Sequence, residues 1–157
     1  MISRKDIVGT IGEDIIFSNF RSKGYKIAKV RPEDEGFDTD LLVLDNIKGL
    51  IGVEVKVISN PIDGYFQIDQ NKMSTYLSLA ASGNYRLFII HANNSKTGAM
   101  IYEVPLKDVH YGATYVVRGN TQELVARIPH GDLIEFDVLS LAENIELKNA
   151  IEEMNRV

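Results

Sequence analysis

Apolar residues recur at helical spacing in the first part of the chain. They predict a helix over residues 3–23, with Ser3 as its N-cap and Gly24 as its stop. The apolar positions of this helix are Ile7, Val8, Ile11, Ile15, Phe17 and Phe20. Glu13 falls on or beside this stripe, four residues before Phe17. Its carboxylate therefore either lies at the rim of the buried face or points inward at a site, and the pattern leaves both open.

Runs of strand length follow the helix. Tyr25–Val30 is expected to be a first strand, and Pro32 and Gly36 mark a turn after it. Leu41–Leu44 and Leu50–Ile58 are two further apolar runs with a short polar break between them. Because the break is short, these two runs are expected to pair as an antiparallel hairpin.

The middle of the chain predicts a crossover between two strands. Residues 59–64 are expected to be a loop, and Asp69 is expected to cap a helix over 70–82. Two apolar residues before that helix are expected to touch the core briefly, Phe66 and Ile68. Tyr85–His91 is the most strand-like run, and Ala99–Val104 forms a further strand. A strand–helix–strand crossover implies that the strands at 50–58 and 85–91 lie parallel.

Hydrophobic patterning is weaker after Pro105. The expected elements there are a helical turn over Leu106–His110, a peripheral hairpin of Thr114–Arg118 with Glu123–Ile128, and a terminal helix over 140–155. The break at Gly119–Asn120 is not expected to be an ideal two-residue turn. The pattern as a whole predicts one α/β domain over residues 1–157, with a central mixed β-sheet flanked by helices. Its core spans about 3–104, and about 105–157 is an extension with a hairpin and a helix, for embellishment or dimerisation.

Composition narrows the class of protein. A chain of 157 residues is long enough for one well-packed domain. It has no cysteine, which excludes disulfides and thiolate metal sites and suits a cytoplasmic protein. No apolar run reaches the roughly 18 residues of a membrane span, and the N-terminus lacks a signal-peptide pattern. We therefore expect a cytoplasmic protein with no membrane partner.

Charge is unevenly distributed. The formal net charge is −5, yet residues 1–31 carry seven Lys/Arg against three Asp/Glu. Residues 132–153 carry seven acidic residues against Lys148 alone. This asymmetry is compatible with a basic face for a polyanion, and equally with solvated surfaces of uneven charge.

Candidate chemistry lies on the expected hairpin. Glu54 and Lys56 alternate with valines, so they project from the same face of their strand. Two interpretations stand: they form ion pairs with a neighbouring strand, or they are part of a site. Asp38 and Asp40 precede the other strand. Carboxylates on an apolar hairpin are costly unless something compensates them. Mg²⁺ or Mn²⁺ would do so, with Asp40 or Asp38, Glu54 and the carbonyl of Val55 as ligands.

The other two candidates would complete such a site. Lys56 would contact a scissile phosphate or help deprotonate the attacking water, and Glu13 would support the metal from the opening helix. The histidines, His91, His110 and His130, are far apart in sequence, so a His-rich zinc site is not expected.

Glu in an opening helix, an Asp before an apolar strand and Glu-x-Lys in the next strand resemble the PD-(D/E)XK nucleases. The resemblance covers roughly residues 8–104 and is similar to archaeal Holliday junction resolvases and Mrr-type nucleases. It implies a restriction-endonuclease-like fold and a metal-dependent nuclease that acts on DNA, often as a homodimer. Gly36-x-Asp38 matches the Mrr-like form and Thr39-Asp40 the Pro-Asp form. We favour Asp40 as the ligand because it adjoins the strand.

Some relatives carry Gln-x-x-x-Tyr on the following helix, whereas Gln70 and Tyr76 here are six residues apart. Candidate phosphate contacts are Arg4, Lys5, Arg21 and Lys23 in the basic segment, and Gln67, Gln70 and Lys72 near the second helix, for which solvent exposure is the better explanation.

The predicted function is a Mg²⁺-dependent endonuclease on DNA, either structure-specific like a Holliday junction resolvase or of restriction type. The alternatives are a catalytically inactive nuclease-fold subunit for DNA binding or regulation, and a purely structural domain. No helix-turn-helix or zinc finger is recognisable, so recognition by DNA shape or through a partner is expected.

Overall fold

The computed structural model describes residues 4–30, 41–58, 64–92 and 98–140, together with Ile145 and Asn149. Side chains at 4–7, 92, 98, 118 and 140 are outside this description. The elements are α1 (Arg4–Ser22), β1 (Lys26–Lys29), β2 (Leu41–Asp45), β3 (Gly49–Ile58), β4 (Tyr65–Asp69), α2 (Gln70–Ala80), β5 (Tyr85–Ala92), β6 (Gly98–Val104), β7 (Gly112–Arg118), β8 (Thr121–Pro129), η1 (His130–Asp132) and β9 (Ile134–Ser140).

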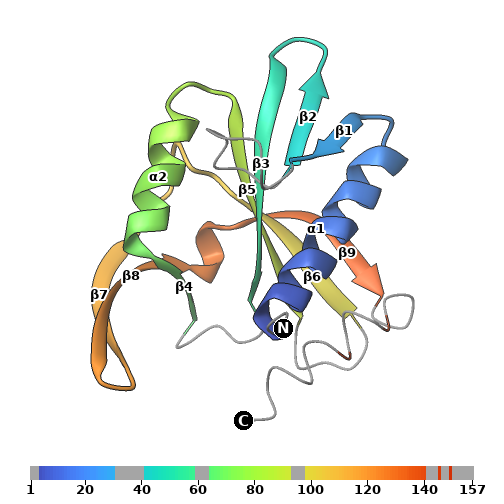
Figure 1. Cartoon of the computed structure of the whole chain (residues 1–157). Coiled ribbons are helices and arrows are strands. Elements are labelled where there is room, and N and C mark those ends of the chain that lie inside the picture. The colour runs from blue at the N-terminus through green and yellow to red at the C-terminus, as the bar shows by residue number, and fades with distance from the viewer. Residues whose placement is uncertain are drawn as a thin grey trace.

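Nine strands of this description form two sheets (Figure 1). The larger sheet has the order β1-β2-β3-β5-β6-β9, and the smaller has the order β4-β8-β7. The β3–β5 pair is parallel, whereas the other pairs are antiparallel. The predicted mixed sheet, the antiparallel β2–β3 hairpin and the parallel crossover through α2 are therefore confirmed.

The two faces of the large sheet bury different cores. Helix α1 covers one face, where Ile16 and Phe20 pack against Val53, Val55 and Phe88. On the other face, the second core combines residues of α2, of β4 and β8, and of β5 and β6. Figure 1 shows α1 and α2 on opposite sides of the strands, with the β7–β8 hairpin extending away beside α2. Strand β3 thus presents one face to each helix.

Local chemistry sets the start of α2. The side chain of Asp69 accepts hydrogen bonds from the backbone N–H groups of Asn71 at 2.9 Å and Lys72 at 3.2 Å. These bonds satisfy two donors that a helix start leaves unpaired, which confirms the predicted cap. After the helix, Gly83 adopts a φ of 85°, a left-handed conformation that allows the chain to turn into β5.

Two strands were missed by the sequence prediction. Residues 65–69 were expected only to touch the core, yet they form β4 because they pair with β8, some 60 residues later in the chain. The segment at 134–140, Ile-Glu-Phe-Asp-Val-Leu-Ser, forms β9, the sixth strand of the large sheet, through pairing with β6. The predicted terminal helix therefore cannot begin at Ser140. Ile145 and Asn149 are helical, and the other residues of the predicted span from 141 onward lie outside the described residues.

The extension also differs from its prediction in two details. The helical turn expected over Leu106–His110 is instead a shorter hydrogen-bonded turn at 106–108, in which Asp108 N–H donates to the Pro105 carbonyl at 2.9 Å. The peripheral hairpin is present, with strands longer than expected, and Arg118 pairs with Thr121 across a two-residue turn. Residues of β8 lie in the second core, so the region after 104 contributes to the packed interior. No helix in the described part of the chain is both long and apolar enough to cross a membrane.

Gly12 provides a test of the α1–β3 packing. A Cβ at this position would lie 2.5 Å from Val57 Cγ2, whereas a Cβ at Gly9 would meet nothing within 4 Å. Gly12→Ala should therefore lower the free energy of unfolding by about 1–2 kcal/mol, since overpacking outweighs the gain in helix propensity. Gly9→Ala, in the same helix, should raise it by about 0.5–1 kcal/mol. Urea denaturation would measure both, and equal effects would contradict this packing.

Candidate active site

Glu54 is the one charged side chain that is buried among the described residues. It lies on β3, next to Val53 and Val55, and its exposed fraction is 8%. Val53 and Val55 belong to the core beneath α1, so Glu54 points to the opposite face of the sheet, toward α2. A buried carboxylate is costly without partners, so its neighbours determine what it can do.

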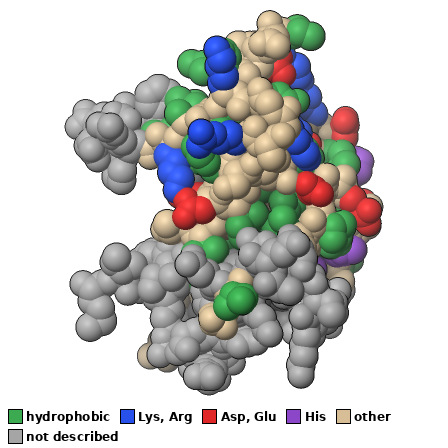
Figure 2. All heavy atoms as spheres, turned by 90° about the vertical axis from the view of Figure 1, so that its right-hand side faces the viewer, with side chains coloured by type: hydrophobic (Ala, Val, Ile, Leu, Met, Phe, Trp, Pro, Cys, Tyr) green, Lys and Arg blue, Asp and Glu red, His purple; other side chains and the backbone are tan. Residues whose placement is uncertain are grey.

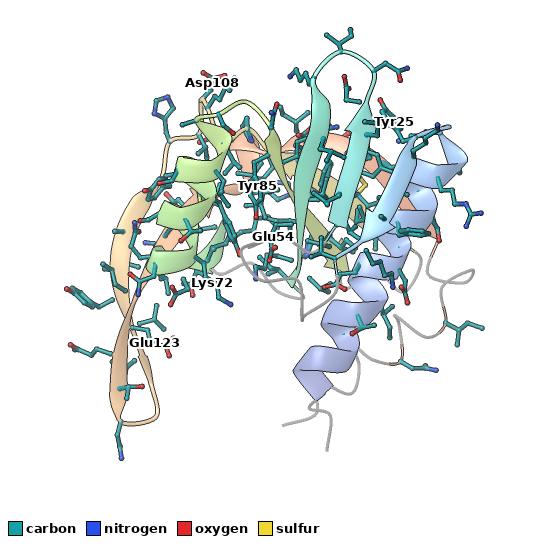
Figure 3. The ribbon with its side chains drawn as sticks, turned by 45° about the horizontal axis from the view of Figure 1, so that its top comes forward. Tyr25, Glu54, Lys72, Tyr85, Asp108 and Glu123 are labelled. Atoms are coloured by element: carbon teal, nitrogen blue, oxygen red, sulfur yellow. The ribbon has the colours of Figure 1, made fainter. Side chains whose placement is uncertain are left out.

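Two side chains compensate the Glu54 carboxylate. Lys56 Nζ lies 3.3 Å from Glu54 Oε1, as the alternation of β3 predicts. Tyr76 of α2 donates its hydroxyl to the same oxygen at 3.3 Å. Lys56 Nζ is also 5.8 Å from the centre of the Tyr76 ring, and that ring stacks on Tyr85 at 5.9 Å. Figure 3 shows Glu54 on β3 on the side of α2, with Tyr85 nearby.

The environment of this cluster shifts two pKa values. Burial acts to lower the pKa of Lys56, but the Tyr76 oxygen and the Glu54 carboxylate outweigh it and raise the pKa above its usual value. Burial, reinforced by the negative charge of Glu54, raises the pKa of Tyr76 to about 12. At neutral pH the cluster therefore holds an ammonium group and a neutral phenol around one carboxylate.

The cluster lies just beyond the described pairing of β2 with β3. The last β2–β3 pair is Leu41 with Val53, whereas β3 continues to pair with β5 as far as Ile58. Glu54 and Lys56 thus follow directly after the point where β2 begins. Asp38 and Asp40 precede Leu41 in the chain and lie outside the described residues, so the choice between them stays a prediction.

Glu13 comes from the other side of the sheet. It is partly buried on α1, one residue after Gly12, which packs against Val57 and Val55. The valine face of β3 is opposite to the face of Glu54 and Lys56. To support the same site, Glu13 would have to reach it from the opposite face of β3, and its proposed role remains a prediction.

The described donors suit a hard cation in kind. The Glu54 carboxylate and the Val55 carbonyl are oxygen ligands, which Mg²⁺ and Mn²⁺ prefer. Within the described residues, no group of three or more Asp, Glu, His or Cys side chains is close enough to hold a metal. Divalent metal binding at this site would therefore need a further carboxylate, as Asp40 or Asp38 would supply.

The sequence matches no protein-family model, and none of the curated proteins matches it either. Among solved structures, it is similar to a Holliday junction resolvase (Hjc) of the archaeon Archaeoglobus fulgidus, with 14% identity and a TM-score of 0.51, over 82% of this chain and 91% of that chain. The chain has a restriction-endonuclease-like fold. A bacterial homing endonuclease matches over the whole of both chains with 16% identity and a TM-score of 0.42.

The fold predicted from Glu-x-Lys and its neighbouring elements is thereby confirmed. The structure brings together the side chains of Glu54 and Lys56, which the sequence placed on one face of the strand, and their role in catalysis stays a prediction. Tyr76 was not taken as a site residue, because its spacing of six residues from Gln70 departs from Gln-x-x-x-Tyr. Its helical spacing with Met73 and Ala80 marked it as a core residue, which it is. The available signal was its hydroxyl, since a buried tyrosine usually pairs that group with a partner.

The three predicted phosphate contacts near α2 lie in different surroundings. Lys72 is exposed and precedes Tyr76 by one helical turn, so it lies on the side of α2 that faces the Glu54 cluster (Figure 3). Gln70 Nε2 instead donates to the Ser74 hydroxyl at 3.3 Å and to the Tyr111 hydroxyl at 3.5 Å. Gln67 is half-buried on β4. Of the three, Lys72 is the one that suits a phosphate at this site.

Two lysines of the basic segment, residues 1–31, have partners within the protein, which the composition did not indicate. Lys29 pairs with Asp14, and Lys23 Nζ lies 3.6 Å from Asp137 Oδ2 and 3.9 Å from the centre of the Phe136 ring. Arg21 is exposed at the C-terminal end of α1. Figure 2 shows lysine and arginine side chains on this face with acidic side chains among them. Arg4 and Lys5 lie at the other end of α1, roughly 25 Å away at 1.5 Å per residue, and their side chains are not described.

Two histidines are closer than the sequence indicated. His91 and His130 both pack on Phe66, with ring centres at 5.3 Å and 5.7 Å. His91 Nδ1 is 3.1 Å from the Ile58 carbonyl, and His130 Nε2 is 3.1 Å from the Tyr102 hydroxyl. Because each ring has a nearby hydrogen-bond partner and both pack on an aromatic ring, they support packing at the ends of β5 and β8.

The Tyr76–Glu54 hydrogen bond predicts a measurable stability change. Tyr76→Phe keeps the ring but leaves the buried carboxylate with one partner fewer, so the free energy of unfolding should fall by about 1–2 kcal/mol in urea. Tyr115→Phe, at an exposed position, should change it by less than about 0.5 kcal/mol. In a Glu54→Gln background the Tyr76→Phe effect should shrink, and an unchanged effect would show that the bond contributes nothing.

Proposed function

We propose that this chain is a metal-dependent endonuclease that hydrolyses phosphodiester bonds in DNA. The observation that supports this proposal most directly is the burial of Glu54 beside Lys56 on β3. Burying a carboxylate is unfavourable for folding alone, and perturbed ionisable groups are typical of functional sites. The fold, which the chain shares with a Holliday junction resolvase, supports a nuclease.

The metal would be held by oxygen donors. Glu54, the carbonyl of Val55 and one of Asp40 or Asp38 would bind Mg²⁺ or Mn²⁺, with Asp40 favoured because it adjoins β2. When bound, such an ion polarises the phosphoryl oxygens and lowers the pKa of a coordinated water. Glu13 would support this set from α1.

The protein side chains would then position the substrate. Lys56 would bring a positive charge to the scissile phosphate and to the water that attacks it. Tyr76 would hold the Glu54 carboxylate in place through its hydroxyl. Lys72 would contact a neighbouring phosphate, and Arg4 and Lys5 would do so at the other side of the site. Arg21, Lys23 and Gln70 are weaker candidates, since Arg21 is distant and the other two have protein partners.

Two forms of this nuclease remain to be distinguished. One is a structure-specific enzyme, for which the shared fold makes a four-way junction the first substrate to test. The other is a restriction-type enzyme with a preferred base sequence. Either form would cut both strands most simply as a homodimer, because a two-fold axis relates two sites to two antiparallel strands. An inactive nuclease-fold subunit is the competing function, favoured by the net charge of −5.

Cleavage assays test the proposal. Supercoiled, linear, single-stranded and four-way-junction DNA would be incubated with Mg²⁺, with Mn²⁺ or with EDTA. We expect cleavage that EDTA abolishes and that falls roughly 10²–10³-fold or more in Glu54→Gln and Lys56→Ala. Asp40→Asn should lose activity and Mn²⁺ binding, whereas Asp38→Asn should retain both.

Controls separate the alternatives. Glu123→Gln, on the hairpin, should cleave like the parent, and circular dichroism should show every variant folded. Junction binding without cleavage under any metal would support the inactive subunit instead. Mn²⁺ affinity that is the same in the parent, Glu54→Gln and Asp40→Asn would exclude the metal site.

A further inference from the structure

The two sheets expose four edge strands within the described part of the chain. The large sheet ends in β1 and β9, and the small sheet ends in β4 and β7. An edge strand presents unpaired backbone N–H and C=O groups, to which another strand can pair. Natural proteins usually prevent such pairing by placing charges, irregular pairing or very short strands at the edges.

Three of these edges carry such features. Strand β1 has four residues and begins and ends with a lysine. Strand β4 has five residues and ends at Asp69, whose carboxylate caps α2. Strand β9 contains Glu135 and Asp137, and its pairing with β6 shifts register between Ile101 and Tyr102.

Strand β7 differs from the other three. It runs for seven residues as Gly-Ala-Thr-Tyr-Val-Val-Arg, with no charged residue before Arg118. Aromatic and β-branched residues of this kind favour strand pairing. Tyr115 is 67% exposed and Val117 is 66% exposed, and their spacing places both on one face of the hairpin. Strand β7 is therefore an edge with apolar side chains and without a protecting charge along most of its length.

The turn shows which backbone groups of β7 face outward. Gly119, with a φ of 62°, occupies the first position of the two-residue turn, as primed turns require. In such a hairpin the flanking pair, Arg118 with Thr121, is hydrogen-bonded, and every second residue back along β7 also bonds to β8. The N–H and C=O groups of Ala113, Tyr115 and Val117 consequently point to the open edge.

We propose that a second copy of this chain docks on this edge, with the two β7 strands antiparallel about a two-fold axis at Tyr115. The inference rests on the homodimer included in the proposed function and names its surface. Tyr115 is the midpoint of β7, so this register overlaps the whole strand. The two small sheets then form one continuous sheet of six strands.

This register is self-complementary. Tyr115 lies opposite Tyr115 of the second copy, and each Val117 lies opposite Ala113, so a larger side chain meets a smaller one. Arg118 lies opposite Gly112, and no like charges meet. DNA is a poorer occupant of this edge, because the strand from Gly112 to Val117 offers no basic side chain for phosphates.

Self-crosslinking tests the register, since the chain has no cysteine of its own. In Tyr115→Cys, the two cysteines would face each other with Cα atoms about 5.5 Å apart, within disulfide range. In Val117→Cys, equally exposed on the same face, they would be offset by four residues, roughly 13 Å. Under mild oxidation Tyr115→Cys should give at least tenfold more covalent dimer than Val117→Cys on a non-reducing gel.

A mixture tests the same register with Tyr115 intact. Ala113→Cys and Val117→Cys should each crosslink poorly alone, but a mixture of the two should crosslink, because these positions lie opposite each other. Equal crosslinking of Tyr115→Cys and Val117→Cys would indicate chance collision and overturn the proposal. Failure of the mixture to exceed its separate components would also overturn it.

Sedimentation equilibrium tests the dimer without any crosslink. The parent should sediment as a dimer, and Tyr115→Lys should shift it to the monomer mass by placing two like charges on the axis. Gln122→Lys, exposed on the neighbouring strand β8, should remain dimeric. A monomeric parent, or a dimeric Tyr115→Lys variant, would overturn the proposal. These outcomes are independent of cleavage: an active monomer contradicts the interface alone, and an inactive dimer contradicts the nuclease alone.

Discussion

The burial of one carboxylate, Glu54, is the constraint on which the site depends. Transferring an isolated charge out of water costs several kcal/mol, and here Lys56 and Tyr76 both bind the same oxygen and offset that cost. Lys56 is supplied by the strand itself, two residues along. Tyr76 is supplied by α2, so this helix must be positioned along β3 such that the Tyr76 hydroxyl reaches Glu54. The capping of α2 by Asp69 determines where that helix begins, and Tyr76 lies seven residues later.

Strand β3 serves two functions through its two faces. Its valines pack beneath α1, and Gly12 allows the two backbones to approach closely there. Its alternate residues carry the charged cluster toward α2. A shift of one residue in the β3 register would exchange the two sets and place Glu54 in the apolar core. The parallel pairing with β5, which spans seven residues, and the antiparallel pairing with β2 therefore maintain the position of the site as well as the sheet.

Local patterns were enough to predict the central part of this fold. Alternation identified β3 and the shared face of Glu54 and Lys56, and turn and cap residues identified the hairpin and the start of α2. What was missed depends on contacts between distant segments. Strand β4 exists because it pairs with β8, and β9 because it pairs with β6. Similarly, the sequence made Lys23 a candidate DNA contact, whereas in the structure it lies beside Asp137, which is 114 residues later in the chain. Tyr76 became a site residue only through its distance to Glu54.

The pairing of charges between Lys56 and Glu54 also bears on how metal and DNA would affect each other's binding. Lys56 and Tyr76 both contact Glu54 Oε1, so a divalent cation held by this carboxylate would weaken its attraction for the ammonium group. A phosphate arriving with the cation supplies a new anionic partner for Lys56. Under the proposed function, cation and phosphate thus replace one ion pair with two, and each compensates the charge that the other displaces. Binding of metal and DNA is then expected to be mutually favourable, because each supplies a partner for the charge that the other leaves less well paired.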